Sequence, residues 1–223
     1  TPQTNSSDVA SVSSISEEEK ALMALAEDLD SWNLTLINRS HPLPDQFSVK
    51  TATIAASYAR DNGMVYDARA VSNLNAMCAA AEADGVTLLV ISSFRTRAKQ
   101  TSLYNNQINK MRARYPNLSQ SEIEAKAGTV SAYPGTSEHE LGLAIDFNSV
   151  EETFDKTEQF RWLQAHAEEY GFVMRYAKEK ESITGIIYEP WHYRYVGEKH
   201  AKKINDLGFC LEEYVEYLEK YSK

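Results

Sequence analysis

The sequence has no long apolar segment and no dense cluster of basic residues. Its longest apolar stretch, residues 86–91, is far shorter than the roughly 20 residues that a membrane-spanning helix requires. The formal net charge is −9, from 23 Lys and Arg against 32 Asp and Glu. Nucleic-acid binding requires clustered Lys and Arg, because these side chains contact the phosphates. We therefore expect neither direct membrane insertion nor a nucleic-acid partner.

Cysteine is also scarce, with only Cys78 and Cys210 in 223 residues. Neither has a second cysteine or a histidine at the spacing typical of a structural zinc site, which disfavours zinc bound by thiolates. Two buried free thiols and one disulfide of an exported protein both fit this pattern. The sequence leaves these two alternatives open.

The first residues differ in composition from the rest of the chain. Residues 1–15 are rich in Ser, Thr and Asn without a periodic apolar pattern, which predicts a flexible tether, with a plain disordered terminus as the alternative. Residues 16–223 are enough for a single domain with a full hydrophobic core. The chain starts at Thr1 without an initiator methionine or a signal peptide, and we interpret it as a trimmed or mature fragment.

The remaining sequence predicts a mixture of helices and strands. Residues 141–147 alternate between larger apolar side chains and Gly, Ala or Asp, and a period of two indicates a strand. Residues 86–94 are apolar and β-branched, which predicts a buried strand with Arg95 at its end. Thr96 is expected to cap a helix that runs to about residue 114, and Asp67 a helix to about residue 83. Strands and helices do not alternate strictly, so we predict an α+β fold with an antiparallel sheet flanked by helices.

Two short segments carry the residue types that bind metal ions. The first places His139 and Asp146 seven residues apart, with Gly142 between them to let the backbone bend. The second, about forty residues later, contains Glu189 and His192. Two imidazoles and one carboxylate, with the fourth position left to water, form a ligand set typical of a catalytic zinc ion. Glu189 would then remain as a spare carboxylate that can act as a base.

Pro190 disfavours a helix through the second segment. The arrangement therefore differs from the HExxH motif, in which both histidines lie on one face of a helix. A single histidine is more often packed or exposed than bound to a metal, and we assign His41, His166 and His200 to that class. The two histidines of the metal-binding segments differ from them, because each has an acidic residue nearby in a matching local context.

The two segments resemble the motifs of the VanY/LdcB-type D-alanyl carboxypeptidases, which are zinc DD- and LD-peptidases of peptidoglycan. The first motif reads Ser-x-His-x-x-Gly-x-Ala-x-Asp over residues 137–146, and the second reads Glu-x-Trp-His over residues 189–192. Further matches lie at residues 36–44, 66–67, 92–96, 100, 103–104 and 193–197, so the resemblance covers roughly residues 34–210. It implies the α+β fold shared by the hedgehog signalling domain and the DD-peptidases.

The resemblance also implies a metal site and a base. One zinc ion per chain would be held by three ligands, His139, Asp146 and His192. Glu189 would take a proton from water and pass it to the leaving amine. This role falls to Glu189, and not to Glu138 or Glu140, because Glu189 matches the family's glutamate three residues before the second histidine.

Three further residues match family positions around the substrate. The planar guanidinium of Arg95 suits both a terminal carboxylate and the oxyanion of a tetrahedral intermediate. Gln100 and Ser137 match positions that line the substrate site, where an amide and a hydroxyl can bond the peptide backbone. We interpret Arg39, Arg97 and Arg194 as structural.

The function implied by the resemblance is removal of the C-terminal D-Ala from peptidoglycan stem peptides, in the D,D- or the L,D-reaction. The partner is then the stem peptide, and we expect an extracellular or cell-envelope monomer, tethered through an N-terminal signal or anchor segment that this chain does not include. Two alternatives are an endopeptidase of the phage-lysin type and a non-catalytic, zinc-stabilised wall-binding domain. Glu189 disfavours the second, because a structural zinc site closes its fourth position and needs no base. Two imidazoles and an aspartate also accept other divalent ions.

Overall fold

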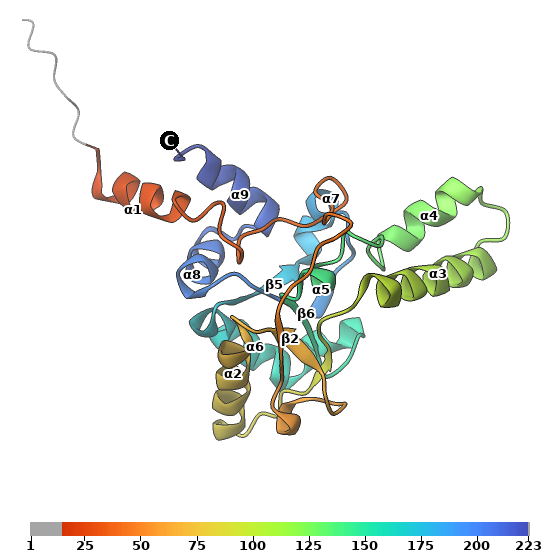
Figure 1. The fold of residues 1–223 in the computed structure, drawn as a ribbon, viewed down its shortest axis with the longest axis horizontal. Coiled ribbons are helices and arrows are strands. Elements are labelled where there is room, and N and C mark those ends of the chain that lie inside the picture. Colours follow the sequence, from red (N-terminus) through yellow and green to blue (C-terminus); the bar gives the residue numbers. More distant parts are fainter. Residues whose placement is uncertain (1–14, 223) are drawn as a thin grey trace, which may run out of the picture.

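The fold is built around two antiparallel sheets, and the computed structural model describes residues 15–222 (Figure 1). The larger sheet has the strand order β3–β4–β6–β5, with β3 at Val90–Ser92, β4 at Ala144–Phe147, β5 at Phe172–Tyr176 and β6 at Glu189–Tyr195. The smaller sheet pairs β1 (Thr51–Thr53) with β2 (Val65–Asp67). All neighbouring strands are antiparallel, which confirms the predicted α+β class. The predicted tether lies outside the described residues, except for Ile15.

Helices surround the larger sheet. The α-helices are α1 (Glu17–Ala26), α2 (Val71–Ala83), α3 (Arg97–Arg114), α4 (Gln120–Gly128), α5 (Glu138–Leu141), α6 (Glu158–His166), α7 (Glu181–Thr184), α8 (Glu198–Leu207) and α9 (Leu211–Glu219). Short 3₁₀ helices are η1 (Ala56–Tyr58), η2 (Glu152–Lys156), η3 (Ala167–Tyr170) and η4 (Lys178–Lys180). The predicted cap at Thr96 is confirmed, since its hydroxyl accepts from the backbone N–H of Lys99.

Both faces of the larger sheet are buried. One core cluster joins side chains of this sheet to α2 and α6, and a second joins it to α1, α8 and α9. Phe172 and Val173 on β5 belong to different clusters, because successive side chains of a strand point to opposite faces. A smaller cluster holds α3 against α4, and Figure 1 shows this helix pair extending away from the sheet. The sheet is therefore held between two packed layers of side chains.

Two predicted strands are shorter in the structure. The strand predicted over residues 141–147 begins only at Ala144, because Glu138–Leu141 form the single turn of α5. Gly142 ends that turn in the left-handed conformation at φ 86°, which glycine adopts without steric cost. The strand predicted over residues 86–94 is confined to β3. Before it, the side chain of Asn148 bonds the Leu89 N–H and the Thr87 carbonyl, in place of a neighbouring strand.

The predicted cap of α2 by Asp67 is wrong. Asp67 lies in β2, and its carboxylate accepts hydrogen bonds from the backbone and the side chain of Arg69. The helix begins at Val71 after Ala70, without a side-chain cap. The short polar side chain is thus used to close the turn between β2 and α2.

The structure also tests the predictions for the two cysteines and for a membrane span. Cys78 in α2 and Cys210 before α9 are both buried free thiols, so the disulfide alternative is wrong. No helix within residues 15–222 combines the length and the hydropathy that a membrane span needs.

Candidate metal centre

The register of the larger sheet places three side chains in a row. Ser92 on β3 stands opposite Asp146 on β4, and Asp146 stands opposite His192 on β6. Directly opposed residues on antiparallel strands have Cβ atoms about 5 Å apart. The hydrogen-bonded ladder therefore holds Asp146 beside His192, although 45 residues separate them in the sequence.

His139 reaches the same place from α5. Its backbone carbonyl accepts from the Arg95 N–H at 3.0 Å, which ties α5 to the end of β3. The left-handed turn at Gly142 then lets the chain enter β4. A Cβ added to Gly142 would lie 3.2 Å from a methyl of Val49, so the turn is also crowded. The Nδ1 of His139 is 2.8 Å from the carbonyl oxygen of Ser93, to which it donates, leaving Nε2 to face Asp146.

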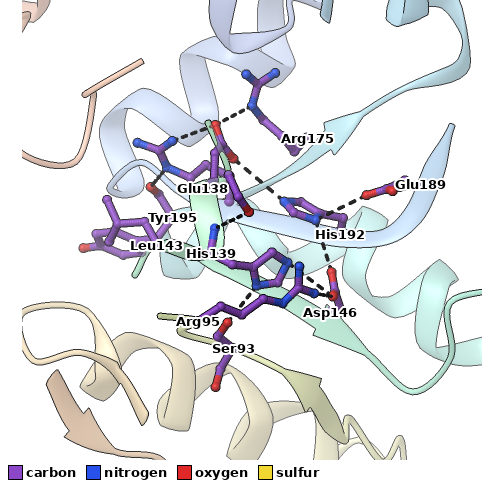
Figure 2. Close-up of polar contacts among 12 residues, drawn as sticks. Ser93, Arg95, Glu138, His139, Leu143, Asp146, Arg175, Glu189, His192 and Tyr195 are labelled. Carbon is purple, nitrogen blue, oxygen red and sulfur yellow. Dashed lines mark hydrogen bonds and ion pairs between the residues drawn. The ribbon is translucent and has the colours of Figure 1, made fainter. Parts of the chain in front are cut away.

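The three predicted ligands converge. One ligand atom from each of His139, Asp146 and His192 lies within 4.8 Å of the other two, and each residue is at most 4% exposed. Nε2 of His139 is 3.3 Å from Oδ2 of Asp146, and Nδ1 of His192 is 3.1 Å from Oδ1 (Figure 2). The two imidazole rings meet edge to face with centroids 4.9 Å apart.

These three side chains fit a cation. Oδ1 of Asp146 is buried and has no hydrogen-bond donor among the residues that the structure describes. His139 uses its Nδ1 proton on Ser93, so the lone pair of its Nε2 points toward the carboxylate. Two acceptors that face each other in a dry site repel unless a positive charge lies between them. Two histidine nitrogens and one aspartate oxygen are the donors that zinc accepts in its catalytic sites.

The pKa values of the three groups describe the same polarised cluster. Burial and the nearby Arg95 lower the pKa of His139 to about 4. Burial alone would raise the pKa of Asp146, but His139 and His192 hold it well below its usual range. Burial would lower the pKa of His192, yet its contacts with Asp146 and Glu138 raise it to about 9. The centre thus pairs one fixed negative charge with positive charge, which a metal cation can supply.

Glu189 lies beside the cluster. It begins β6, opposite Tyr176 on β5, and its Oε2 is 3.4 Å from Nδ1 of His192. Only 9% of the residue is exposed, and burial raises the pKa of its carboxyl to about 7. Glu189 is therefore close enough to the ligands to contact a molecule bound there.

A cavity of about 710 Å³ opens over these residues. The predicted residues Arg95, Ser137 and Glu189 line it together with the three ligands, and part of α3 forms one wall. Arg95 donates to Asp146 at 3.0 Å and keeps 20% of its side chain exposed. Ser137 also caps α5, since its hydroxyl accepts from the His139 N–H.

Gln100 occupies a different position from the one predicted. It is 1% exposed, and it is not among the described residues that line the cavity. Its side-chain oxygen accepts from Arg95 at 3.2 Å, and its nitrogen donates to the carbonyl of Ala132 at 2.8 Å. The geometry favours a role in holding Arg95 over direct contact with a substrate.

The two glutamates beside His139 point elsewhere. Glu140 binds Arg97 and the backbone N–H of Gly135. Glu138 binds Arg175 and Arg194. Neither glutamate is among the described residues that line the cavity, so neither is placed to act as the base. Sequence reasoning missed Arg175. Its one signal is a single charged residue within the otherwise apolar or aromatic strand β5.

The comparisons with known proteins identify the family. The family model described as VanY, D-alanyl-D-alanine carboxypeptidase, matches residues 64–198. A D-alanyl-D-alanine carboxypeptidase of Enterococcus faecalis is 39% identical over 200 residues, which cover 89% of this chain and 72% of that protein. The chain belongs to the VanY family of D-alanyl-D-alanine carboxypeptidases.

Solved structures agree with the VanY assignment. A zinc complex of the vancomycin-resistance D,D-pentapeptidase VanY has a TM-score of 0.72 and 39% identity, covering 83% of this chain and 99% of that one. VanYB in complex with D-alanine-D-alanine has a TM-score of 0.73 and 39% identity, and the match covers 83% of this chain and 98% of that one. The LD-carboxypeptidase LdcB has a TM-score of 0.71 and 34% identity, and the match covers 81% of this chain and 84% of that one. The chain is thus a metallo-carboxypeptidase with the VanY/LdcB fold.

Proposed function

We propose that this chain is a zinc-dependent carboxypeptidase that removes the C-terminal D-Ala from peptidoglycan stem peptides. One zinc ion per chain would be held by three side chains, His139, Asp146 and His192. The observation that carries the proposal is their convergence within 4.8 Å at a cavity that Glu189 also lines. An exposed cavity beside the cluster leaves room for water and a peptide, whereas a structural zinc site is closed by a fourth protein ligand.

Zinc and Glu189 have different roles in the proposed reaction. When bound, zinc would act as a Lewis acid that makes water more acidic and polarises the scissile carbonyl. Glu189 takes a proton from the attacking water and then delivers it to the nitrogen of the leaving D-Ala. Its carboxylate lies 3.4 Å from the ring of His192, within reach of a molecule at the cluster. A base in this position contributes about 10²–10⁴-fold to the rate.

Arg95 orients the substrate from the cavity wall. Its guanidinium donates to Ser92, Gln100 and Asp146, which fixes its plane while part of the side chain faces the cavity. A planar guanidinium can bind a terminal carboxylate through two parallel hydrogen bonds, and it can stabilise an oxyanion. We assign both tasks to Arg95, with Gln100 behind it and Ser137 beside the peptide.

The substrate class follows from the relatives. The D,D-pentapeptidase VanY and the VanYB complex with D-alanine-D-alanine are each 39% identical to this chain, against 34% for the LD-carboxypeptidase LdcB, so we favour the D,D-reaction over the L,D-reaction. Stem peptides lie in the cell wall, and we propose that residues 16–223 act there as one monomeric domain. The N-terminal residues would then link this domain to the envelope.

Metal analysis tests the ligand set. Wild-type protein should carry one zinc ion per chain, and His139→Ala and His192→Ala should each lose it, measured by elemental analysis after dialysis. The matched control is His200→Ala, because His200 is buried against Asp28 and Tyr214, away from the cluster. Full zinc occupancy in both ligand variants would exclude this site.

Mass spectrometry of digested muropeptides tests the reaction. Loss of a single alanine from pentapeptides supports the D,D-carboxypeptidase, and loss from tetrapeptides indicates the L,D-reaction instead. Cleavage within the stem or cross-bridge would identify an endopeptidase. No product from any of these substrates, with zinc bound, would leave the wall-binding alternative.

A further inference from the structure

A buried carboxylate lies behind His192, on the side of the ring that faces away from the metal cluster. Oε2 of Glu138 is 3.8 Å from Nε2 of His192, and both residues are less than 5% exposed. Neither atom has a hydrogen-bond partner among the residues that the structure describes. An approach of about 1 Å would bring the two atoms to hydrogen-bond distance. Figure 2 shows Glu138 at one end of the ring and Asp146 with Glu189 at the other.

The orientation of the ring determines where its proton must be. Nδ1 of His192 faces Asp146 at 3.1 Å and Glu189 at 3.4 Å, so this nitrogen is the one aimed at the cluster. A neutral imidazole carries one proton, and a lone pair used at Nδ1 leaves that proton on Nε2. A buried N–H needs an acceptor, and Oε2 of Glu138 is in place to be that acceptor.

The other histidine is arranged the opposite way. His139 uses Nδ1 to donate to the Ser93 carbonyl and presents Nε2 to the cluster. Its rear partner is thus a neutral backbone oxygen, whereas the rear partner of His192 is a carboxylate. A carboxylate behind a histidine ligand orients the ring and makes the ligating nitrogen a stronger donor.

Two arginines bind one oxygen of Glu138 and leave its other oxygen without a hydrogen-bond partner among the described residues. Arg175 Nε and Arg194 Nη1 donate to the same oxygen, Oε1, at 2.8 and 2.7 Å. Glu212 accepts two further bonds from Arg175, both at 2.7 Å. Two arginines and two glutamates balance in charge without a contribution from His192. The remaining oxygen of Glu138 is directed at the ring.

We propose that Glu138 is a positioning residue for the metal site. Its Oε2 accepts the Nε2 proton of His192, which fixes the tautomer that presents Nδ1 to the metal and raises the affinity of that nitrogen. The inference rests on the proposed zinc site. Loss of such a partner behind a ligand lowers metal affinity by about 10–100-fold.

Two variants that remove the same charge from the same network test this role. Glu138→Gln and Glu212→Gln each delete one carboxylate beside Arg175, but only Glu138 faces His192. Zinc affinity, measured by competition with a chromophoric chelator, should fall about 10–100-fold in Glu138→Gln and stay close to wild type in Glu212→Gln. Wild-type affinity in Glu138→Gln, or an equal loss in both variants, would overturn the proposal.

A second measurement needs no variant and so does not depend on its folding. Nitrogen NMR of zinc-loaded wild-type protein with ¹⁵N-labelled histidine should show His192 protonated at Nε2 and bound through Nδ1, and His139 the reverse. Binding of His192 through Nε2 would overturn the proposal. Wild-type protein that binds no zinc would remove the proposed function as well, whereas bound zinc with unchanged affinity in Glu138→Gln defeats this inference alone.

Discussion

Arginine and carboxylate groups lie on both sides of the cluster formed by His139, Asp146 and His192, and the two sides differ in their exposure to solvent. On the cavity side, Arg95 pairs with Asp146 and keeps 20% of its side chain exposed. On the rear side, the side chains of Arg175 and Arg194 are 1% and 0% exposed, and both bind Glu138. On the cavity side the guanidinium contacts a proposed metal ligand, Asp146, directly. On the rear side the two guanidinium groups contact Glu138, which in turn faces His192.

The difference in exposure assigns different tasks to the two sides. A partly exposed guanidinium can exchange a protein partner for a substrate carboxylate, because water and ligand reach it from the cavity. A fully buried one cannot, since loss of a partner leaves an unpaired charge in a dry interior. We therefore expect changes on the cavity side to reduce activity with little loss of stability. Changes on the rear side should reduce stability first, and at Glu138 they should also reduce metal affinity.

The largest expected effect is on the cavity side, in Glu189→Gln. Removal of the base should lower kcat about 10²–10⁴-fold, because the amide cannot take a proton from water. Zinc content should stay at the wild-type value, since Glu189 is not among the three ligands. The measurement is release of D-Ala from a peptide that ends in D-Ala-D-Ala, with zinc content determined on the same sample. Turnover close to wild type would show that another group is the base.

The second-largest expected effect is a loss of stability on the rear side, in Arg194→Met. Glu138 would keep its charge but lose one of its two arginines, and Arg194 also donates to the carbonyls of Asn33 and Thr35. Removal of one partner from a buried pair costs about 3–5 kcal/mol of unfolding free energy. Urea denaturation of the metal-free protein measures the loss.

Arg95→Met is the control for the rear-side prediction, since it removes the guanidinium from the cavity side. The loss of stability in Arg95→Met should be less than half of that in Arg194→Met, because Arg95 is partly exposed to water. Equal losses in the two variants would mean that exposure does not distinguish the two sides.

Sequence reasoning found the cavity side because local patterns encode it. His139, Gly142 and Asp146 lie within eight residues, and Glu189 and His192 within four. The motifs singled out His139, Asp146 and His192, and the structure brings these three residues together. The same reasoning began the strand at Leu141, because the alternation of apolar residues starts there. Leu141 is instead the last residue of the α5 turn, which the left-handed Gly142 ends, and β4 begins at Ala144.

The rear side has no comparable local signal. Glu138 and Glu140 flank His139 symmetrically in the sequence, yet one binds Arg175 and the other binds Arg97. The partners of Glu138 lie 37 and 56 residues away. Only the register of β5 and β6 and the packing of α9 bring them together, so these contacts follow from tertiary structure and not from a motif.

A smaller effect on the cavity side is expected for Arg95→Lys. An ammonium keeps the charge but cannot form the two parallel bonds of a guanidinium, and each bond to a charged group is worth about 1.5–3 kcal/mol. We expect kcat/KM to fall about 10–100-fold for a peptide with a free C-terminal carboxylate. The fall should be smaller for the same peptide with a terminal amide, since wild-type Arg95 has no carboxylate to bind there.

The control for Arg95→Lys is Arg97→Lys. Arg97 binds Glu140 and does not belong to the described residues that line the cavity. Its replacement should leave the preference for a free carboxylate unchanged. A preference that survives in Arg95→Lys would assign carboxylate recognition to another side chain.

The smallest effect concerns the charge of Glu212, at the outer end of the rear network. Burial opposes ionisation, but Arg175 holds the pKa of Glu212 below its usual range. A lowered pKa stabilises the fold fully above the pKa of the unfolded chain, about 4.3, and this stabilisation is lost as the pH falls further. Wild type should therefore exceed Glu212→Gln in unfolding free energy by about 1–3 kcal/mol near pH 7, and the gap should shrink from pH 5 to pH 3.

Glu216→Gln is the control for this pH dependence, because Glu216 pairs with Lys220 on the exposed surface of α9. The unfolding free energy of Glu216→Gln should differ little from that of wild type at every pH, since exposed ion pairs contribute little to stability. A gap for Glu212→Gln that does not change with pH would mean that Glu212 acts through its shape and its hydrogen bonds. The negative charge would then be needed only at Glu138, where the carboxylate faces the proposed ligand His192, and the rear network would reduce to the ion pairs of Glu138 with Arg175 and Arg194.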